Sequence, residues 1–96
     1  MRAASPTPAT SSQPKLARHV RLSFDTARRR HVLLSPETVA VLNGTSAEIL
    51  RLCDGRRTVA RIVAELRERY ENVAEDEVRA FLARMTAKHY VEIIDG

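Results

Sequence analysis

The chain has 96 residues, with 16 Lys or Arg against 12 Asp or Glu and a formal net charge of +4. This length allows one small domain, and no segment approaches the roughly 18 apolar residues that a membrane helix needs. The single cysteine, Cys53, excludes an internal disulfide and a metal site built on paired cysteines. No secretory signal is recognisable, so we expect a cytoplasmic protein.

The N-terminal residues differ in composition from the rest of the chain. Residues 1–14 are mainly Ala, Ser, Thr and Pro and carry one charge. Such a segment cannot bury enough apolar surface to offset the entropy that is lost on ordering. We therefore predict a disordered tail over residues 1–14 and one folded domain over residues 15–96. The basic side chains gather early, because the first 36 residues contain seven Lys or Arg and only Asp25 as an acid.

Three short segments have the pattern of strands. Residues 20–24 alternate apolar and polar side chains, which is typical of a strand with one buried face. Apolar runs at residues 31–34 and 38–42 follow after short polar turns. Because the connections are short, the sequence predicts an antiparallel sheet of three consecutive strands.

A turn and a helix start follow the third strand. Asn43 and Gly44 are suited to a tight turn, and Thr45 with Glu48 has the spacing of a capping box, in which each side chain satisfies a backbone N–H of the other residue. We therefore expect the first helix at about residues 46–53. Gly55 would close it in the left-handed conformation that glycine tolerates.

Apolar residues then recur at helical spacing. Thr58 is suited to cap a helix whose apolar stripe runs from Val59 to Tyr70. A third helix is expected at about residues 75–88, and its stripe consists of Val78, Phe81, Leu82 and Met85. For residues 90–94 the sequence allows either a short strand or a tail. Because strands precede helices, the sequence predicts an α+β domain with a three-stranded antiparallel sheet followed by three helices.

Residues that could carry catalysis are few and scattered. Cys53 lies on the apolar side of its helix, which favours a small buried hydrophobe over a nucleophile. His19, His31 and His89 show no metal-binding spacing. The carboxylates at residues 75–77 are consecutive in a helix, so they point in different directions and favour its dipole rather than one site. The sequence predicts no enzyme, no cofactor and no metal.

The densest charge cluster is formed by Arg28, Arg29 and Arg30. It could be the wing of a winged-helix DNA-binding protein, a contact with an acidic peptide or protein, or a solvated turn. The third helix argues against DNA binding, because its first turn carries three carboxylates that phosphates would repel.

The segment from Thr38 to Leu42 is apolar on both faces of a strand. At the edge of a sheet such a strand needs a cover, which could be another part of this chain, a second copy or an extended peptide added as a further strand. The third helix would then form the other wall of a groove. Self-association as a homodimer therefore stays an open alternative to peptide binding.

The segment TSAEILRLCDG at residues 45–55, followed by Thr58 and Val59, resembles the PqqD family of pyrroloquinoline quinone (PQQ) biosynthesis. Upstream, VLLSPE at residues 32–37 is similar as well, and the resemblance covers about residues 16–94. One departure concerns the end of the third helix, where relatives commonly have Gly and this chain has His89. Either His89 adopts a left-handed conformation or the helix continues.

The resemblance implies a winged-helix-like peptide-recognition domain without catalytic activity. It would bind the precursor peptide PqqA and present it to the radical-SAM enzyme PqqE. The peptide would add as a strand along residues 38–42 and lie against the third helix. The implied peptide-binding residues are Thr38, Val39, Ala40, Val41, Leu42, Val78, Phe81, Leu82 and Met85. Independently of the resemblance, the charge cluster makes Arg28, Arg29 and Arg30 candidate partner contacts.

Overall fold

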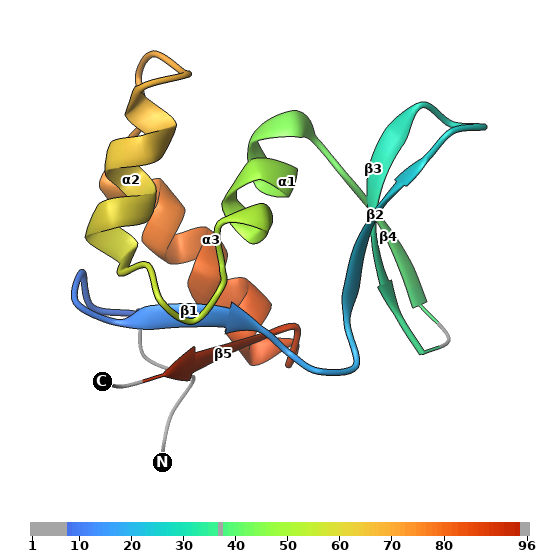
Figure 1. The fold of residues 1–96 in the computed structure, drawn as a ribbon, viewed down its shortest axis with the longest axis horizontal. Helices are drawn as coiled ribbons and strands as arrows, with labels where there is room; N and C mark the ends of the chain where they lie inside the picture. The colour runs from blue at the N-terminus through green and yellow to red at the C-terminus, as the bar shows by residue number, and fades with distance from the viewer. Residues whose placement is uncertain (1–7, 37, 95–96) are drawn as a thin grey trace.

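The computed structural model describes residues 8–36 and 38–94. Its elements are β1 (Gln13–Leu16), β2 (Arg21–Asp25), β3 (Arg30–Ser35), β4 (Thr38–Leu42), α1 (Gly44–Arg51), α2 (Val59–Arg67), α3 (Glu75–Ala87) and β5 (Val91–Ile94). The helices gather on one side, and the sheet formed by β2, β3 and β4 stands on the other (Figure 1). The α+β fold with three antiparallel strands and three helices is as predicted. None of the described helices is long and apolar enough to cross a bilayer.

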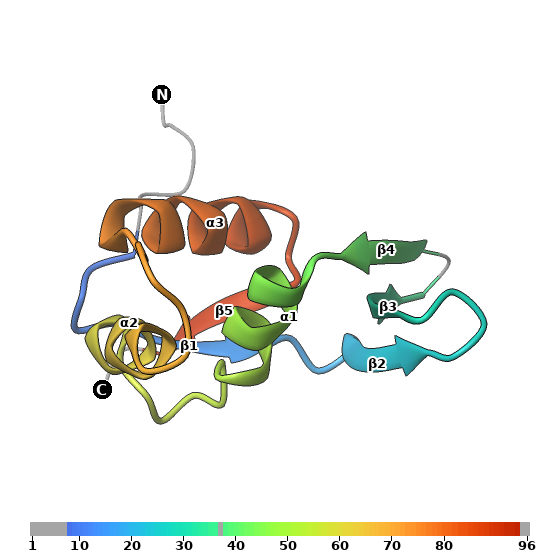
Figure 2. The same cartoon turned by 90° about the horizontal axis from the view of Figure 1, so that it is seen from above.

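The three-stranded sheet has β3 in the middle and β2 and β4 at its edges. Leu33 pairs with Leu22 and Ala40, and all three side chains belong to the core or pack against it. Val32 pairs with Val41 on the opposite face, since residues directly across an antiparallel pair share a face. β4 is the edge strand on the same side of the molecule as α3 (Figure 2). Helix α3 and the edge of β4 that is not paired with β3 therefore lie on the same side of the molecule.

A second sheet joins the two ends of the chain. β1 pairs antiparallel with β5, so that Gln13 lies opposite Ile94 and Leu16 opposite Val91. The backbone of Lys15 also pairs with that of Asp54 in an isolated antiparallel β-bridge. Of the two alternatives for the C-terminal segment, the strand is the correct one, because Val91–Ile94 form β5.

The predicted tail boundary at residue 14 differs from the structure. Val59 donates its N–H to the carbonyl of Ser12 at 2.9 Å, and Ala60 donates to that of Thr10 at 3.0 Å. The Nε of Arg79 donates to the carbonyl of Pro8 at 2.8 Å. Hydrogen bonding holds this segment, because its carbonyls satisfy N–H groups at the start of α2 that have no partner within the helix. Residues 1–7 lie outside the described part of the chain.

The start of α1 differs from the prediction. Asn43 is the N-cap, with an extended backbone and a side-chain oxygen that accepts the N–H of Ser46 at 2.7 Å. The predicted capping box at Thr45 is therefore wrong. Asn is as good a cap as Thr, and its earlier position lets the helix begin at Gly44. The predicted cap of α2 is confirmed, since the hydroxyl of Thr58 accepts the N–H of Arg61 at 3.1 Å.

Two left-handed residues redirect the chain after α1 and α3. Gly55 has φ +80°, but α1 already ends at its C-cap Leu52, so Gly55 shapes the following loop and donates its N–H to the carbonyl of Pro14 at 2.9 Å. His89 has φ 64°, as the first of the two predicted alternatives requires. The turn at His89 brings the chain back into β5.

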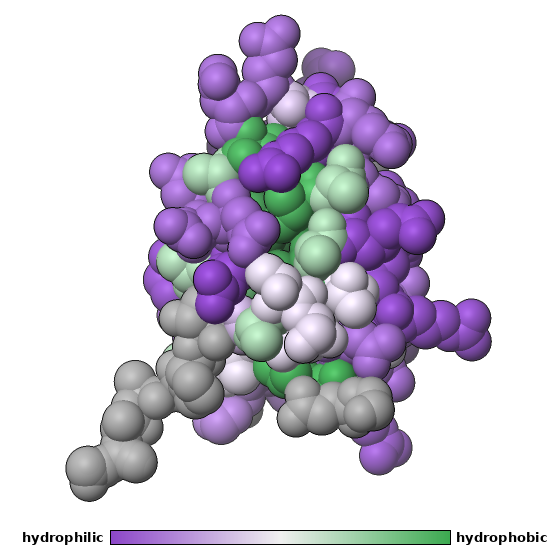
Figure 3. Space-filling view, turned by 90° about the vertical axis from the view of Figure 1, so that its left-hand side faces the viewer, coloured by the Kyte–Doolittle hydropathy of each residue, from purple (hydrophilic) through white to green (hydrophobic). Residues whose placement is uncertain are grey.

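The core lies between the helices and the inner face of the sheet. Its least exposed large side chains include Leu33, Leu50, Ile62, Leu66 and Leu82. The face of the molecule away from the three-stranded sheet is mostly hydrophilic, with a narrow strip of apolar side chains between charged ones (Figure 3). Leu33 and Leu42 extend the core into the sheet, which fixes the position of β4 relative to the helices.

Candidate functional site

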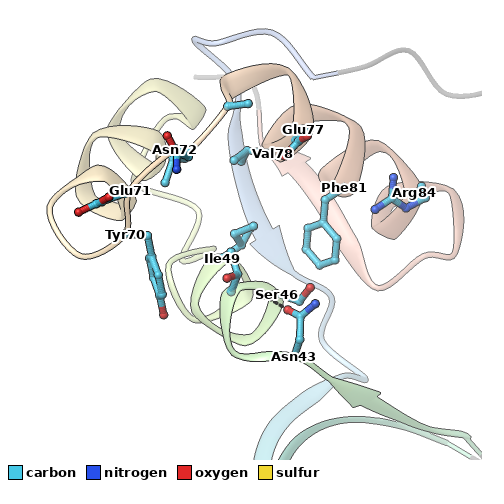
Figure 4. A pocket seen from close by; sticks show the side chains of 13 residues that line it. Asn43, Ser46, Ile49, Tyr70, Glu71, Asn72, Glu77, Val78, Phe81 and Arg84 are labelled. Atoms are coloured by element: carbon cyan, nitrogen blue, oxygen red, sulfur yellow. Dashed lines mark hydrogen bonds between the residues drawn. The ribbon is translucent and has the colours of Figure 1, made fainter.

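A pocket lies next to the end of β4. It has a volume of about 320 Å³ and is bounded by the start of α1, the loop between α2 and α3, and one side of α3 (Figure 4). Asn43, which directly follows β4, lines one wall, and Phe81 of α3 lines the wall opposite. An extended chain lying along β4 would therefore reach the pocket as it passes the end of the strand.

The pocket combines apolar walls with a polar rim. Ile49, Val78 and Phe81 are buried core residues that also line it. The ring of Phe81 points toward α1 (Figure 4), and the guanidinium carbon of Arg84 lies 5.8 Å from the centre of that ring. Arg84 is exposed, so its charge stands at the rim. Glu71 and Glu77 also line the pocket, so Arg84 is one positive group beside two carboxylates, and the apolar walls suit an apolar side chain.

The residues of β4 divide between the two faces of the sheet. Val39 is 57% exposed and Val41 49% exposed, whereas Leu42 is buried and Ala40 is half-buried against the core. Thr38, at the start of the strand, is exposed. β4 thus offers its backbone edge to an added strand while its inward side chains hold it in place.

The stripe of α3 divides in the same way. Val78 and Leu82 are buried, and Leu82 has no exposed surface. Both position the helix, and Val78 also lines the pocket. Phe81 reaches the pocket, and Met85 is half-buried against the core. Of the predicted stripe, Val78 and Phe81 therefore line the pocket, whereas Leu82 is enclosed in the core and Met85 lies outside the pocket lining.

Several pocket residues were missed from the sequence. Asn43 was expected in a turn and Tyr70 in a helical stripe, yet Tyr70 lies beyond the end of α2 and lines the pocket. Ser46 and Arg84 were not singled out. A signal existed for Arg84, because a residue three positions after Phe81 lies on the same side of a helix. For Tyr70 the sequence contains no such signal, because the residue at which α2 ends determines where the Tyr70 side chain points.

In the arginine cluster, Arg28 and Arg29 lie in the turn between β2 and β3, and Arg30 is the first residue of β3, away from the helices (Figure 1). Asp25 accepts the backbone N–H of Arg28 at 3.1 Å and its Nη1 at 2.8 Å. These bonds, the backbone one first, lower the pKa of the Asp25 carboxyl. Arg29 has φ 56°, which fixes the turn. The cluster is therefore a separate surface from the pocket.

The chemistry of Cys53 matches the prediction of a buried hydrophobe. Its thiol donates to the carbonyl of Ile49 at 3.2 Å, and burial raises its pKa to about 12. A thiol with such a pKa stays protonated at neutral pH and is a poor nucleophile. Within residues 8–36 and 38–94, no three side chains of His, Cys, Asp or Glu are grouped as metal ligands would be.

Solved structures with the same fold define a class of recognition domain. The chain is similar to the solution NMR structure of the PqqD part of Methylobacterium extorquens PqqCD, described as a functional, stand-alone recognition element for ribosomally synthesized and post-translationally modified peptides (RiPPs). That match has a TM-score of 0.67 and 36% identity, and it covers 88% of this chain and 94% of the other. The heterocyclase TruD shares the fold alone, with a TM-score of 0.62 and 20% identity over 86% of this chain and 12% of that enzyme. The fold is that of a RiPP recognition element.

Sequence comparison gives the family. The chain is 44% identical to the PqqA binding protein of Pseudomonas aeruginosa (strain UCBPP-PA14), over 90% of this chain and 96% of that protein. It is 50% identical to the PqqA binding protein of Rhodopseudomonas palustris (strain TIE-1), over 62% of this chain and 59% of that protein. Residues 30–91 match the family described as coenzyme PQQ synthesis protein D (PqqD). The chain belongs to the PqqD family.

Proposed function

We propose that this protein is a peptide-binding adaptor that binds the precursor peptide PqqA and presents it to the radical-SAM enzyme PqqE. The observation that carries the proposal is the free edge of β4, which leads into the pocket between α1 and α3. The names of the relatives, a PqqA binding protein and a recognition element, support a binding role without catalysis.

Peptide binding would use the backbone of β4 and the side chains of α3. A peptide added as a strand forms main-chain hydrogen bonds with Thr38–Leu42, which supply affinity with little dependence on sequence. Side chains that enter the pocket beside Phe81 and meet Arg84 then supply selectivity. β4 is favoured over β2, the other edge, because the pocket lies at the end of β4.

An adaptor of this kind acts by position. Holding the precursor peptide close to the enzyme raises the local concentration of the reacting segment without changing the chemistry of the reaction. The protein would need only a peptide site and a surface for the enzyme. Its lone cysteine is buried and protonated, in keeping with a role that requires no nucleophile.

Hydrogen exchange with an internal control tests the site. Isothermal titration with PqqA should first give saturable binding. Backbone amides of β4 should then become more protected against exchange in the complex, because an added strand accepts hydrogen bonds from them. Amides at the outer edge of β2 serve as the control and should change little. Absence of binding at high micromolar concentrations, or protection of β2 instead of β4, would contradict the proposal.

A matched pair of variants tests the pocket. Arg84→Ala should weaken PqqA binding by about three- to tenfold, because it removes a rim charge and its contact with Phe81. Lys88→Ala removes the same charge one turn later, at the C-cap of α3, where the side chain is exposed and outside the pocket lining. It should bind as the wild type does. Equal affinities of the two variants would argue against a role for the pocket.

A further inference from the structure

The outer face of the three-stranded sheet carries an apolar cluster apart from the core. Val39 and Val41 lie there opposite Leu34 and Val32, and both are about half exposed. Val32 is only 3% exposed although it does not belong to the core cluster. Its own neighbours on the outer face therefore shield it, and together these four residues form what we call the outer patch. They face away from the helices and from the pocket.

Positive charge borders the outer patch. Arg21 pairs with Leu34 and so shares this face, and Arg30 pairs with Asp25 at the far end of the same face. Asp25 already binds Arg28. Among the described residues, Arg21, Arg29 and Arg30 make no ion pair with a carboxylate. A partner surface that complements this apolar centre and basic border carries acidic groups around it.

We propose that the outer patch and its arginines dock the enzyme that modifies the bound peptide, through an apolar area bordered by carboxylates on that enzyme. The inference rests on the proposed function and identifies the surface through which the adaptor would contact the enzyme. Charge complementarity selects this occupant. A second copy of the chain fits poorly, because a symmetric contact would place the basic border of one copy against that of the other. Nucleic acid fits poorly too, because phosphates leave the apolar centre uncovered.

The position of the patch explains how an adaptor can present its cargo. β4 belongs to both surfaces, since its backbone edge is free for the peptide while Val39 and Val41 point to the outer face. A peptide strand added to β4 would place every second side chain on that outer face, next to Val39 and Val41. An enzyme docked there contacts the adaptor and the peptide together. Peptide and enzyme should then strengthen each other's binding by the same factor.

The test compares single substitutions outside β4 and the pocket. Arg30→Gln removes one border charge, and Leu34→Thr replaces an apolar side chain of the patch by a β-branched polar one. Each should weaken association with PqqE by about three- to tenfold and leave the titration with PqqA alone unchanged. Arg56→Gln is the matched control, because Arg56 is exposed in the loop before α2 and makes no ion pair among the described residues. It should associate as the wild type does.

Further measurements separate the two proposals. PqqA titrated without enzyme tests the proposed function alone, so its failure leaves the docking surface to be judged by the direct association with PqqE. Rising salt should weaken that association less for Arg30→Gln than for the wild type. The inference is overturned if Arg30→Gln and Arg56→Gln associate equally with PqqE. It is also overturned if Leu34→Thr abolishes a dimer in sedimentation, or if the arginines confer salt-dependent affinity for duplex DNA.

Discussion

At the scale of single residues, Asn43 connects fold and site. It directly follows the strand whose edge is proposed to receive the peptide, it caps the next helix, and it lines the pocket. Its amide oxygen satisfies one of the backbone N–H groups that a helix leaves without partners at its start. The position of β4 relative to α1 therefore depends on one short side chain.

Asn43→Ala should lower the free energy of unfolding by about 1 kcal/mol, because the N–H of Ser46 loses its acceptor. Thr45→Ala is the control and should cost less than about 0.5 kcal/mol, since Thr45 is exposed and is already the second residue of the helix. Urea unfolding of both variants gives the comparison. A larger loss for Thr45→Ala would restore the capping box that the sequence suggests.

The difference between these two caps shows what sequence patterns resolve. Spacing predicts that a helix follows the third strand, but Asn43 and Thr45 are both acceptable caps, and only the path of the backbone chooses between them. The same holds for Tyr70, which fits the α2 stripe by spacing and leaves it because the helix ends at Arg67. The order of the strands in the sheet, the number of helices and the edge position of β4 do not depend on such local alternatives. Short connections and apolar periodicity specify them.

At the scale of elements, the N-terminal segment is the part of the chain whose structure its amino-acid composition fails to predict. Residues 8–12 contribute little apolar area, yet their carbonyls cap the first turn of α2 and bind Arg79 of α3. Composition indicates how much apolar area a segment can bury on folding. These contacts depend instead on unpaired N–H groups elsewhere in the chain. The contacts bring the N-terminal segment, α2 and α3 together at one end of the domain.

A chain that starts at Gln13 should be less stable than the full chain by about 1–3 kcal/mol, because two backbone hydrogen bonds to α2 and the bond from Arg79 are lost. Arg79→Ala in the full chain should cost less, since it removes only the last of these. Denaturant unfolding of the three proteins measures the difference. Equal stability of the shortened and full chains would mean that residues 8–12 behave as the predicted tail.

At the scale of the whole molecule, four surface carboxylates accept charge-assisted or backbone hydrogen bonds. Asp25 and Asp54 accept backbone N–H groups first of all, from Arg28 and Arg57, and these bonds lower the pKa of each carboxyl. For Glu48 and Glu65 the main cause of the lowered pKa is a hydrogen bond from an arginine side chain, Arg51 and Arg57 respectively. The folded state therefore favours the charged form of all four groups.

The stability of the protein should fall as the pH drops below about 5. The unfolded chain, whose carboxyls keep ordinary pKa values, takes up protons first, so stability present at neutral pH is lost as the folded-state carboxylates become protonated. Glu65→Gln should flatten this decline, because Glu65 accepts from Arg57 and Arg61. Glu68→Gln, at an exposed carboxylate without an ion pair in the described chain, is the control. Thermal unfolding at a series of pH values gives the slopes, and identical slopes for both variants would refute the assignment.

The pairing of β1 with β5 has a consequence for linkage to other proteins. Gln13 and Ile94 are cross-strand partners, so the chain enters and leaves this sheet at one place, at the end of the domain opposite the three-stranded sheet (Figure 1). A tether joined through either strand would leave the edge of β4 and the outer patch uncovered. The domain is thus built so that covalent fusion to an enzyme, at either end, would raise local concentration without competing for the surfaces that do the binding.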